Sequence, residues 1–215
     1  PDGLVTGVQT CALPIYEIIY GAACIDNNGK GLYSTQLNHG DAMHVSDLDP
    51  TRPGMEVWMG HETQSDRAGI EFRDALTGEL IWGLPSQGDV GRSLAADIDP
   101  RHPGYECWAF GPGISGLYSA QGKVISTKTP STCNFRILWD GDLLHELLDR
   151  NFIAKYDWEG DSLKFLLRAP ECRWINGTKA TPVLCADLFG DWREEVIWRT
   201  ADNTALRIYS TTIPT

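Results

Sequence analysis

The sequence of 215 residues predicts an all-β fold, a partial β-propeller of about four to five blades. Three observations lead to this prediction. An acidic loop motif recurs at a spacing of roughly 45 to 50 residues, hairpin motifs recur at a second position in each unit, and long segments lack helical periodicity of apolar residues. A single small sheet cannot bury both of its faces, so we expect the units to stack on one another.

The first fifteen residues differ in character from the rest of the chain. Residues 5–15, with the sequence Val-Thr-Gly-Val-Gln-Thr-Cys-Ala-Leu-Pro-Ile, resemble the conceptual translation of a sequencing-adapter oligonucleotide. We therefore expect residues 1–15 to be a non-native adapter-like segment and residues 16–215 to form the partial propeller domain. The alternative is a natural N-terminal strand. Without Cys11, five cysteines and no C-x-x-C pair remain, so no zinc or redox motif is predicted.

The acidic loop motif has three ungapped copies and one degenerate copy. Each full copy runs from an Asp to a Trp eleven positions later, at 47–58, 97–108 and 187–198. Between the second and third copies, Trp139-Asp-Gly-Asp142 and Glu146 stand in the place of a further copy, and residues 17–20 resemble the end of an earlier one. About four and a half units are thus present, enough to stack but not to close a ring.

The second recurring motif is a Gly-centred turn flanked by short strands. It predicts hairpins at 25–33, 72–82, 117–125 and 154–165. The best candidate for a helix, 143–148, is short, so we expect little helix.

Composition excludes several classes of function. The formal net charge of −11 makes nucleic acid an improbable partner, because phosphate binding needs clustered Lys and Arg. No apolar stretch approaches the length that crosses a bilayer, so no membrane partner is expected. With 42% hydrophobic and 22% charged residues, the chain has the composition of a globular domain with a packed core.

The repeated Asp residues predict ions. Two Asp residues in a tight Pro/Gly loop, followed by a Glu, gather oxygen ligands around one point, and Ca²⁺ accepts such irregular geometry better than Mg²⁺ does. The predicted structural calcium sites are Asp47/Asp49, Asp97/Asp99 and Asp187/Asp191. The alternative is that these side chains cap turns through Asx-type hydrogen bonds with no ion present.

A mixed set of imidazoles and carboxylates lies on either side of the first full loop, in His39-Gly-Asp41 and His61-Glu62. Positions i and i+2 of a strand face the same side, so His39 and Asp41 are predicted to point into one pocket. Such a mixture suits a site where chemistry takes place better than a purely structural calcium loop. The alternative is that both histidines are turn or core residues bonded to the backbone.

Arg92 and Lys179 each precede an acidic loop in the way that His39 does. Equivalent positions on successive blades converge on one mouth of a propeller, so we expect these side chains to share a site with the His39 set. On its own, Asn176-Gly-Thr178 indicates either a glycosylation sequon or a type I′ turn.

Many ordered motifs outside the adapter-like segment resemble those of one family. They lie at 20–23, 31–35, 39–50, 56–58, 61–62, 73–79, 89–92, 96–100, 139–144 and 176–179. On these motifs the chain is similar to the family 11 polysaccharide lyases, the rhamnogalacturonan lyases of secreted bacterial pectin degradation. The resemblance implies an eight-bladed propeller stabilised by Ca²⁺, of which this chain would be the C-terminal half without its extreme end.

The resemblance also implies functional roles. Asn176, Gly177 and Thr178 would contact galacturonate, Arg92 and Lys179 would lie at the reacting centre, and His39, Asp41 and Glu62 would lie near a bound ion. The implied protein is a secreted, calcium-dependent monomer that acts on acidic pectic polysaccharide. By itself this chain is expected to be inactive, and endo and exo cleavage are not distinguished.

The implied reaction is β-elimination at the rhamnose-(1→4)-galacturonate linkage of rhamnogalacturonan I. Lys179 is the first candidate for the base, because a nearby cation disfavours its ammonium form. Arg92 is the second candidate and His39 the third, although Arg hardly ever loses its proton. The main alternative function is a non-catalytic, calcium-dependent propeller for carbohydrate binding or adhesion. A quinone-cofactor dehydrogenase is a weaker alternative, suggested by the Thr-Gly hairpin at 74–82.

Overall fold

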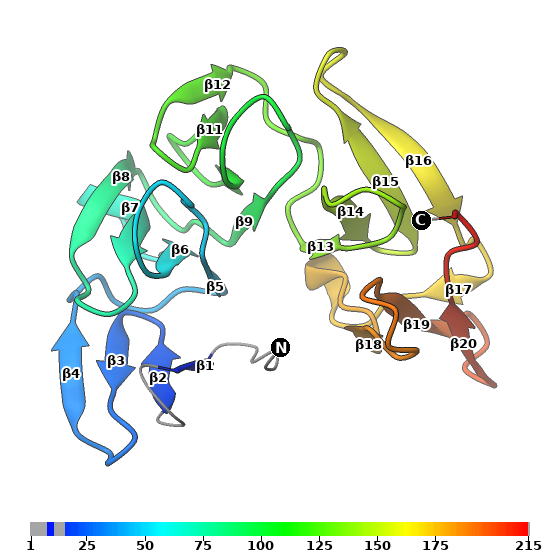
Figure 1. The fold of residues 1–215 in the computed structure, drawn as a ribbon, viewed down its shortest axis with the longest axis horizontal. Coiled ribbons are helices and arrows are strands. Elements are labelled where there is room, and N and C mark those ends of the chain that lie inside the picture. Colours follow the sequence, from blue (N-terminus) through cyan, green and yellow to red (C-terminus); the bar gives the residue numbers. More distant parts are fainter. Residues whose placement is uncertain (1–7, 11–15, 215) are drawn as a thin grey trace. The chain divides into compact units, whose positions relative to one another are not determined.

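The computed structural model describes residues 8–10 and 16–214, and in these residues it is built almost wholly of strands. The strands form five antiparallel sheets of four strands each (Figure 1). Only one short 3₁₀ helix, η1 (Gly177–Lys179), occurs among the described residues. The predicted all-β class is confirmed. None of the described helices is long and apolar enough to span a bilayer.

The chain divides into two compact units, one of residues 1–95 and 102–129 and the other of residues 96–101 and 130–215. The first unit holds three sheets, each of consecutive strands. They are β1 (Val8–Thr10), β2 (Tyr16–Tyr20), β3 (Ala23–Ile25) and β4 (Gly31–Ser34); β5 (Ala42–Ser46), β6 (Glu56–Gly60), β7 (Ser65–Asp74) and β8 (Leu80–Ser86); and β9 (Arg92–Ala96), β10 (Glu106–Phe110), β11 (Leu117–Ser119) and β12 (Val124–Ser126).

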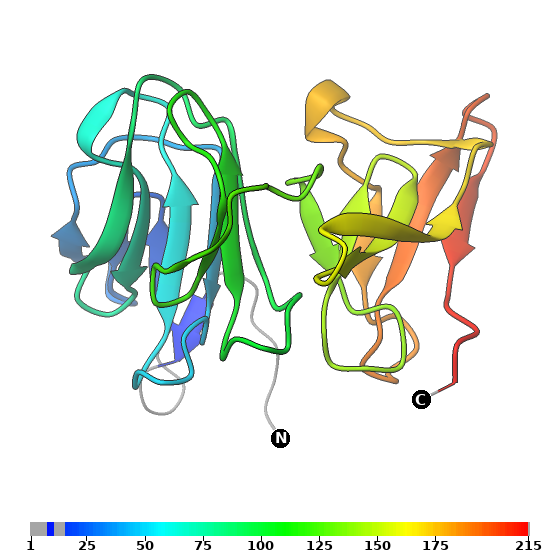
Figure 2. The ribbon, with the colours of Figure 1, turned by 90° about the horizontal axis from the view of Figure 1, so that it is seen from above.

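The second unit, yellow-green to red in Figure 2, holds two sheets. They are β13 (Phe135–Ile137), β14 (Glu146–Asp149), β15 (Phe152–Asp157) and β16 (Ser162–Arg168); and β17 (Cys172–Arg173), β18 (Leu184–Ala186), β19 (Glu195–Thr200) and β20 (Leu206–Tyr209). In the last sheet β19 is central, because it pairs with β17, β18 and β20.

The acidic motif ends at the same structural position in every copy. Trp58, Trp108 and Trp198 lie on β6, β10 and β19, and all three are fully buried. In the degenerate copy Leu148 takes this position on β14. Apolar clusters join neighbouring sheets within each unit. In the first unit, one cluster contains Ile19 and Met59 and another contains Trp58 and Cys107. In the second unit, a cluster contains Leu148 of β14 and Trp198 of β19.

The four predicted hairpins are confirmed as the pairs β3–β4, β7–β8, β11–β12 and β15–β16. The short helix candidate at 143–148 is not formed. Its residues end a loop and begin β14, because Leu147 and Leu148 pair with β15 and are buried in the sheet.

The adapter-like segment stays a prediction. Residues 1–7 and 11–15 lie outside the described residues. Residues 8–10 form β1, which pairs antiparallel with β2.

Candidate functional site

The Glu that follows the first acidic loop and the Glu that follows the third both hold the loop backbone. Glu56 is fully buried at the start of β6, and its Oε2 accepts hydrogen bonds from the amides of Leu48 and Asp49, each at 3.0 Å. Glu195 binds the amide of Leu188 in the same way at 2.9 Å. A buried carboxylate thus satisfies amides that the loop cannot pair elsewhere. Sequence reasoning grouped this Glu with ion ligands and did not foresee its structural use.

All three Asp loops contain the turn hydrogen bonds of the Asx alternative, which run from the amides of Thr51, Arg101 and Arg193 to Asp49, Asp99 and Asp191. Asp49 Oδ1 accepts from the amide and hydroxyl of Thr51, and also from Gln121 Nε2 at 2.8 Å. The Asp99 carboxylate binds the guanidinium of Arg101 through two oxygens, at 2.8 and 2.6 Å. These partners show how the loops are held and do not test whether an ion also binds.

In the third loop Asp187 accepts from the amides of Gly190, Asp191 and Trp192, at 2.6 to 3.2 Å. Asp191 pairs with Arg193 at 2.7 Å. In the residues that the structure describes, the three predicted Asp pairs are not among the groups of three or more ligand side chains that gather around one point. Calcium at Asp47/Asp49, Asp97/Asp99 and Asp187/Asp191 therefore remains a prediction.

Negative charge is concentrated near these loops. Burial raises the pKa of Glu56, and the charges of Asp47 and Asp49 add to the rise. Burial likewise raises the pKa of Asp97 to about 6, with further contributions from the carboxylates of Asp142 and Asp99. A carboxylate in such surroundings gains more from a nearby cation than an exposed one does.

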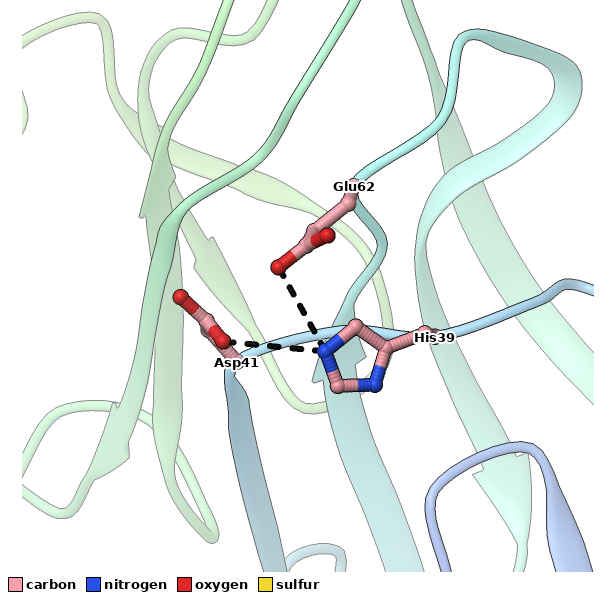
Figure 3. Close-up of side chains that lie close together, drawn as sticks. All are labelled: His39, Asp41 and Glu62. Atoms are coloured by element: carbon pink, nitrogen blue, oxygen red, sulfur yellow. Dashed lines mark ion pairs between the residues drawn. The ribbon is translucent and has the colours of Figure 1, made fainter.

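His39, Asp41 and Glu62 come together as the sequence predicted, and Figure 3 shows both carboxylates directed at one nitrogen of the imidazole. His39 Nε2 lies 3.4 Å from Glu62 Oε1 and 3.8 Å from Asp41 Oδ1. The side chain of His39 is 73% exposed, that of Glu62 40% and that of Asp41 25%. We call these three residues the His39 cluster.

Strand pairing explains the meeting. His39 and Asp41 precede β5, Glu62 follows β6, and the two strands are antiparallel with Ala42 opposite Gly60. The start of one strand and the end of its partner therefore lie at the same end of the sheet. A hydrogen bond of 2.9 Å from the Glu62 amide to the His39 carbonyl joins the two segments directly.

Gly40 allows the backbone of the cluster to approach β6. A Cβ at this position would lie 1.8 Å from the carbonyl oxygen of Gly60, which no side chain can tolerate. Arg92, the first residue of β9, adds a positive charge beside the cluster, because its Nη1 lies 3.9 Å from Asp41 Oδ2. A pocket of about 430 Å³ opens next to His39 and is also lined by Tyr20, Gln36 and Asn38.

A buried polar network begins at His61, the residue before Glu62, and was missed at the sequence level. His61 Nε2 is 3.1 Å from Glu71 Oε1, which also pairs with Arg73, and all three side chains are fully buried. This matches the alternative in which His61 is a core residue. The His61 carbonyl accepts a hydrogen bond from the amide of Val90, which lies two residues before Arg92. The residue after His61 is Glu62. The network thus fixes the segment that carries Glu62.

Residues 176–179 lie in the second unit, on an exposed loop. A bridge between Ile175 and Thr181 closes this loop. Asn176 and Gly177 both have positive φ, and the loop continues as η1, with hydrogen bonds from the amides of Lys179 and Ala180 to the carbonyls of Asn176 and Gly177. Asn176, Gly177 and Thr178 are exposed, whereas Lys179 is half-buried. Arg92 belongs to the first unit, so the predicted sharing of one site by Arg92 and Lys179 stays a prediction.

A second group of three possible ligands was not predicted as a site. Asp140, Asp142 and Glu146 belong to the degenerate copy of the acidic motif, and the Nζ atom of Lys155 contacts all three carboxylates. We call Asp140, Asp142 and Glu146 the Asp140 cluster. The sequence contained a signal, a copy of the motif that departs from the other three, but it did not show which lysine reaches it.

The family model for the C-terminal domain of rhamnogalacturonan lyase family 11 matches residues 14–215, which is nearly the whole chain. The chain belongs to rhamnogalacturonan lyase family 11. The match leaves residues 1–13 outside.

Curated relatives in this family come from Bacillus subtilis (strain 168). Rhamnogalacturonan endolyase YesW is 57% identical over 93% of the chain, and rhamnogalacturonan exolyase YesX is 52% identical over 91%. The chain spans only about a third of each relative, 32% and 34%.

Solved lyase structures agree closely with the fold. The crystal structure of YesW has a TM-score of 0.93 at 53% identity, covering 97% of this chain and 35% of that one. A family 11 rhamnogalacturonan lyase of Bacillus licheniformis gives a TM-score of 0.92 at 52% identity, with the same coverage of 97% and 35%. Because an endolyase and an exolyase both match more than nine-tenths of the chain, at 57% and 52% identity, this similarity does not distinguish the two modes of cleavage.

Proposed function

We propose that this chain is part of a secreted, monomeric lyase that cleaves the rhamnose-(1→4)-galacturonate linkage of rhamnogalacturonan I by β-elimination, with Ca²⁺ as cofactor. We further propose that its five sheets are consecutive blades of an eight-bladed propeller. The observation that carries the functional proposal is the His39 cluster with Arg92 beside it, since it joins metal ligands and a fixed cation at one end of a sheet. Membership of a family whose relatives are named rhamnogalacturonan lyases supplies the substrate class.

The His39 cluster fits a calcium ion through its two carboxylates, because Ca²⁺ takes oxygen ligands. It offers one imidazole nitrogen and two carboxylates whose ligand atoms lie within 4.8 Å of one another. One ion at about 2.3 to 2.6 Å from each oxygen can span that separation. When bound, the ion would supply positive charge for the carboxylate of galacturonate. Exposure of His39 leaves room for a substrate oxygen as a further ligand.

The hard step of such an elimination is removal of the proton at C5 of galacturonate. A base takes this proton, the electrons of the C5–H bond form the C4=C5 double bond, and the C4–O bond breaks. The glycosidic oxygen leaves on the rhamnose and takes up a proton, so no water is consumed. The anion formed on the way carries charge next to a carboxylate, and Arg92 is suited to stabilise it.

We assign substrate contacts to Asn176, Gly177 and Thr178 and the base to Lys179. The supporting observation is that the first three are exposed on a closed loop whose end carries Lys179. A base must be unprotonated, and a bound cation nearby favours the neutral amine of a lysine. Arg92 as the base is disfavoured because its guanidinium stays charged. His39 as the base conflicts with its use as a ligand.

The experiment is an assay of the full-length protein on rhamnogalacturonan I, followed by the ultraviolet absorbance of the unsaturated product. Lys179→Ala and Arg92→Ala should each lower turnover by about 100- to 1000-fold, with the free energy of unfolding changed by less than about 1 kcal/mol. Binding of the polysaccharide without any unsaturated product would instead identify a calcium-dependent carbohydrate-binding propeller. Normal turnover of Lys179→Ala would move the base assignment to His39 or to a residue outside this chain.

A further inference from the structure

We infer that the Asp140 cluster is a cation site whose cation is the ammonium group of Lys155, tethered to the chain in place of a metal ion. The inference concerns the stability of the second unit and does not depend on the proposed lyase activity. It separates this loop from the three loops with predicted calcium sites.

Lys155 satisfies the site completely. An ammonium group has three N–H donors and no acceptor. In the structure these donors meet three carboxylates: Nζ lies 2.7 Å from Asp142 Oδ2 and 3.0 Å from Glu146 Oε1, and it contacts Asp140 Oδ2. The ammonium group of Lys155 thus contacts one oxygen of each of the three carboxylates in the cluster.

Each carboxylate divides its two oxygens between the loop backbone and the lysine. Asp140 Oδ1 accepts from the Asp142 amide, and Asp142 Oδ1 accepts from the Leu144 amide. Glu146 Oε2 accepts from the amides of Trp139 and Asp140, as Glu56 does in the first loop. The second oxygen of each carboxylate faces Lys155. The loop therefore resembles an ion-binding loop, because three carboxylate oxygens are directed to one centre.

The lysine is peculiar to this repeat. The residues opposite the anchoring Glu on the next strand are Asp74 for Glu56 and Ser119 for Glu106. The register of β14 and β15, in which Leu147 is opposite Ala154, places Lys155 opposite Glu146 when it is continued by one residue. The same step in the last sheet places Ser210 opposite Glu195. Only the degenerate motif thus faces a basic residue among these four described positions.

The electrostatics follow from the geometry. Burial works to lower the pKa of Lys155, but its hydrogen bonds to the three carboxylates outweigh burial and raise the pKa above the ordinary value. Burial works to raise the pKa of Asp140, yet the hydrogen bond from Lys155 brings it below the ordinary value. For Glu146, which is fully buried, burial prevails and raises the pKa to about 7. Without the ammonium, three carboxylates would repel one another around an empty centre.

That centre also has the dimensions of a metal site. The ligand atoms of the Asp140 cluster lie within 4.8 Å of one another, the same limit that holds for the His39 cluster. Calcium takes oxygen ligands at about 2.3 to 2.6 Å and accepts irregular geometry. Removal of the ammonium should therefore turn the loop into a calcium site rather than leave it uncharged.

The test counts bound calcium in the full-length protein by isothermal titration calorimetry after treatment with a chelator. Lys155→Ala should bind about one more Ca²⁺ per chain than the wild type, and its melting temperature should rise on adding calcium by more than that of the wild type. Lys155→Gln, which keeps most of the side chain and adds an amide oxygen, is measured in parallel. Lys164→Ala is the matched control, because Lys164 is an exposed lysine of the same hairpin that pairs only with Asp157 among the contacts described.

Each outcome either supports or overturns the inference that Lys155 stands in place of a metal ion. One added ion in either Lys155 variant, lost again when Asp142→Asn is combined with it, supports the inference. Recovery of folded variant only when calcium is present during refolding supports it as well. The wild-type stoichiometry in both Lys155 variants overturns it, and so does failure of both to fold with and without calcium.

Discussion

The His39 cluster and the Asp140 cluster each gather three ligand side chains within the same distance, yet their surroundings differ. The Asp140 cluster contains only carboxylates, one of them on the fully buried Glu146, and all three contact Lys155 from the neighbouring strand of the same sheet. The His39 cluster contains an imidazole that is 73% exposed, and Arg92 Nη1 lies 3.9 Å from Asp41 Oδ2. Ligand spacing alone therefore does not distinguish a functional centre from a structural one. We propose that the two differ in the cation already in place at the Asp140 cluster, the ammonium group of Lys155.

The largest expected difference between the clusters is in turnover. In the full-length protein, Asp41→Asn should reduce the rate of formation of unsaturated product by at least about 100-fold, because it removes charge from the centre that stabilises the transition state. The free energy of unfolding should change by less than about 1 kcal/mol, since Asp41 precedes β5 and its side chain is only partly buried. Lys155→Gln should show the reverse pattern, with near-normal turnover and altered stability.

Glu79→Gln, a change on the exposed β7–β8 turn, serves as the control for loss of a carboxylate. Near-normal turnover of Asp41→Asn would remove the His39 cluster from the proposed active site.

Chelation should produce the next largest effect. If calcium occupies the loops with Asp47/Asp49, Asp97/Asp99 and Asp187/Asp191, excess EGTA should lower the melting temperature of the full-length protein. An ion present at 100 times its dissociation constant stabilises the folded state by about 2.7 kcal/mol per site. Differential scanning calorimetry with EGTA and then with restored calcium measures the change, and magnesium serves as the control ion. An unchanged melting temperature would favour the Asx alternative for all three loops.

Gly40→Ala should destabilise the His39 cluster by about 1 to 3 kcal/mol, the usual cost of forcing atoms into a packed region. The added Cβ meets the Gly60 carbonyl at 1.8 Å, so the segment must move away from β6. Urea denaturation gives the free energy of unfolding. Gly31→Ala is the control, because its Cβ would meet nothing within 4 Å and its φ is not positive. Equal stability of the two variants would show that residues 39–41 are not held against β6.

The smallest expected effect is a pH dependence in the second unit. The pKa of Asp97 is raised from 3.8 to about 6 by burial and by neighbouring carboxylates, so the folded state holds this proton more tightly than the unfolded state. In the presence of chelator, stability should therefore fall as pH rises from about 4 to 6. Solvent screening of this half-exposed group limits its share to about 1 kcal/mol.

Asp97→Asn should remove that share of the pH dependence and should be the more stable protein at pH above about 7 in EGTA. With calcium added, the same substitution should weaken stabilisation if Asp97 is a ligand. A pH profile identical to that of the wild type would contradict the raised pKa.

The all-β class, the repeats and the four hairpins could be predicted because each depends on local signals: a Gly turn, a short apolar run or a fixed spacing. The His39 cluster was predictable for a similar reason, since the start of a strand and the end of its antiparallel neighbour share one end of the sheet. Lys155 and the Glu71–Arg73 pair were not predictable. Their contacts depend on the register between strands and on which residue of a strand faces which neighbour, and a one-residue slip would send each side chain to the opposite face.

The Arg73 guanidinium, buried between the first two sheets, has a consequence for the order in which the chain folds during synthesis. It donates to the Gly21 carbonyl across 52 residues, and the Tyr33 hydroxyl donates to the Ala75 carbonyl across 42. Chains emerge from the ribosome N-terminal end first. These two hydrogen bonds between the first sheet and the second can therefore form only after β7 has been translated.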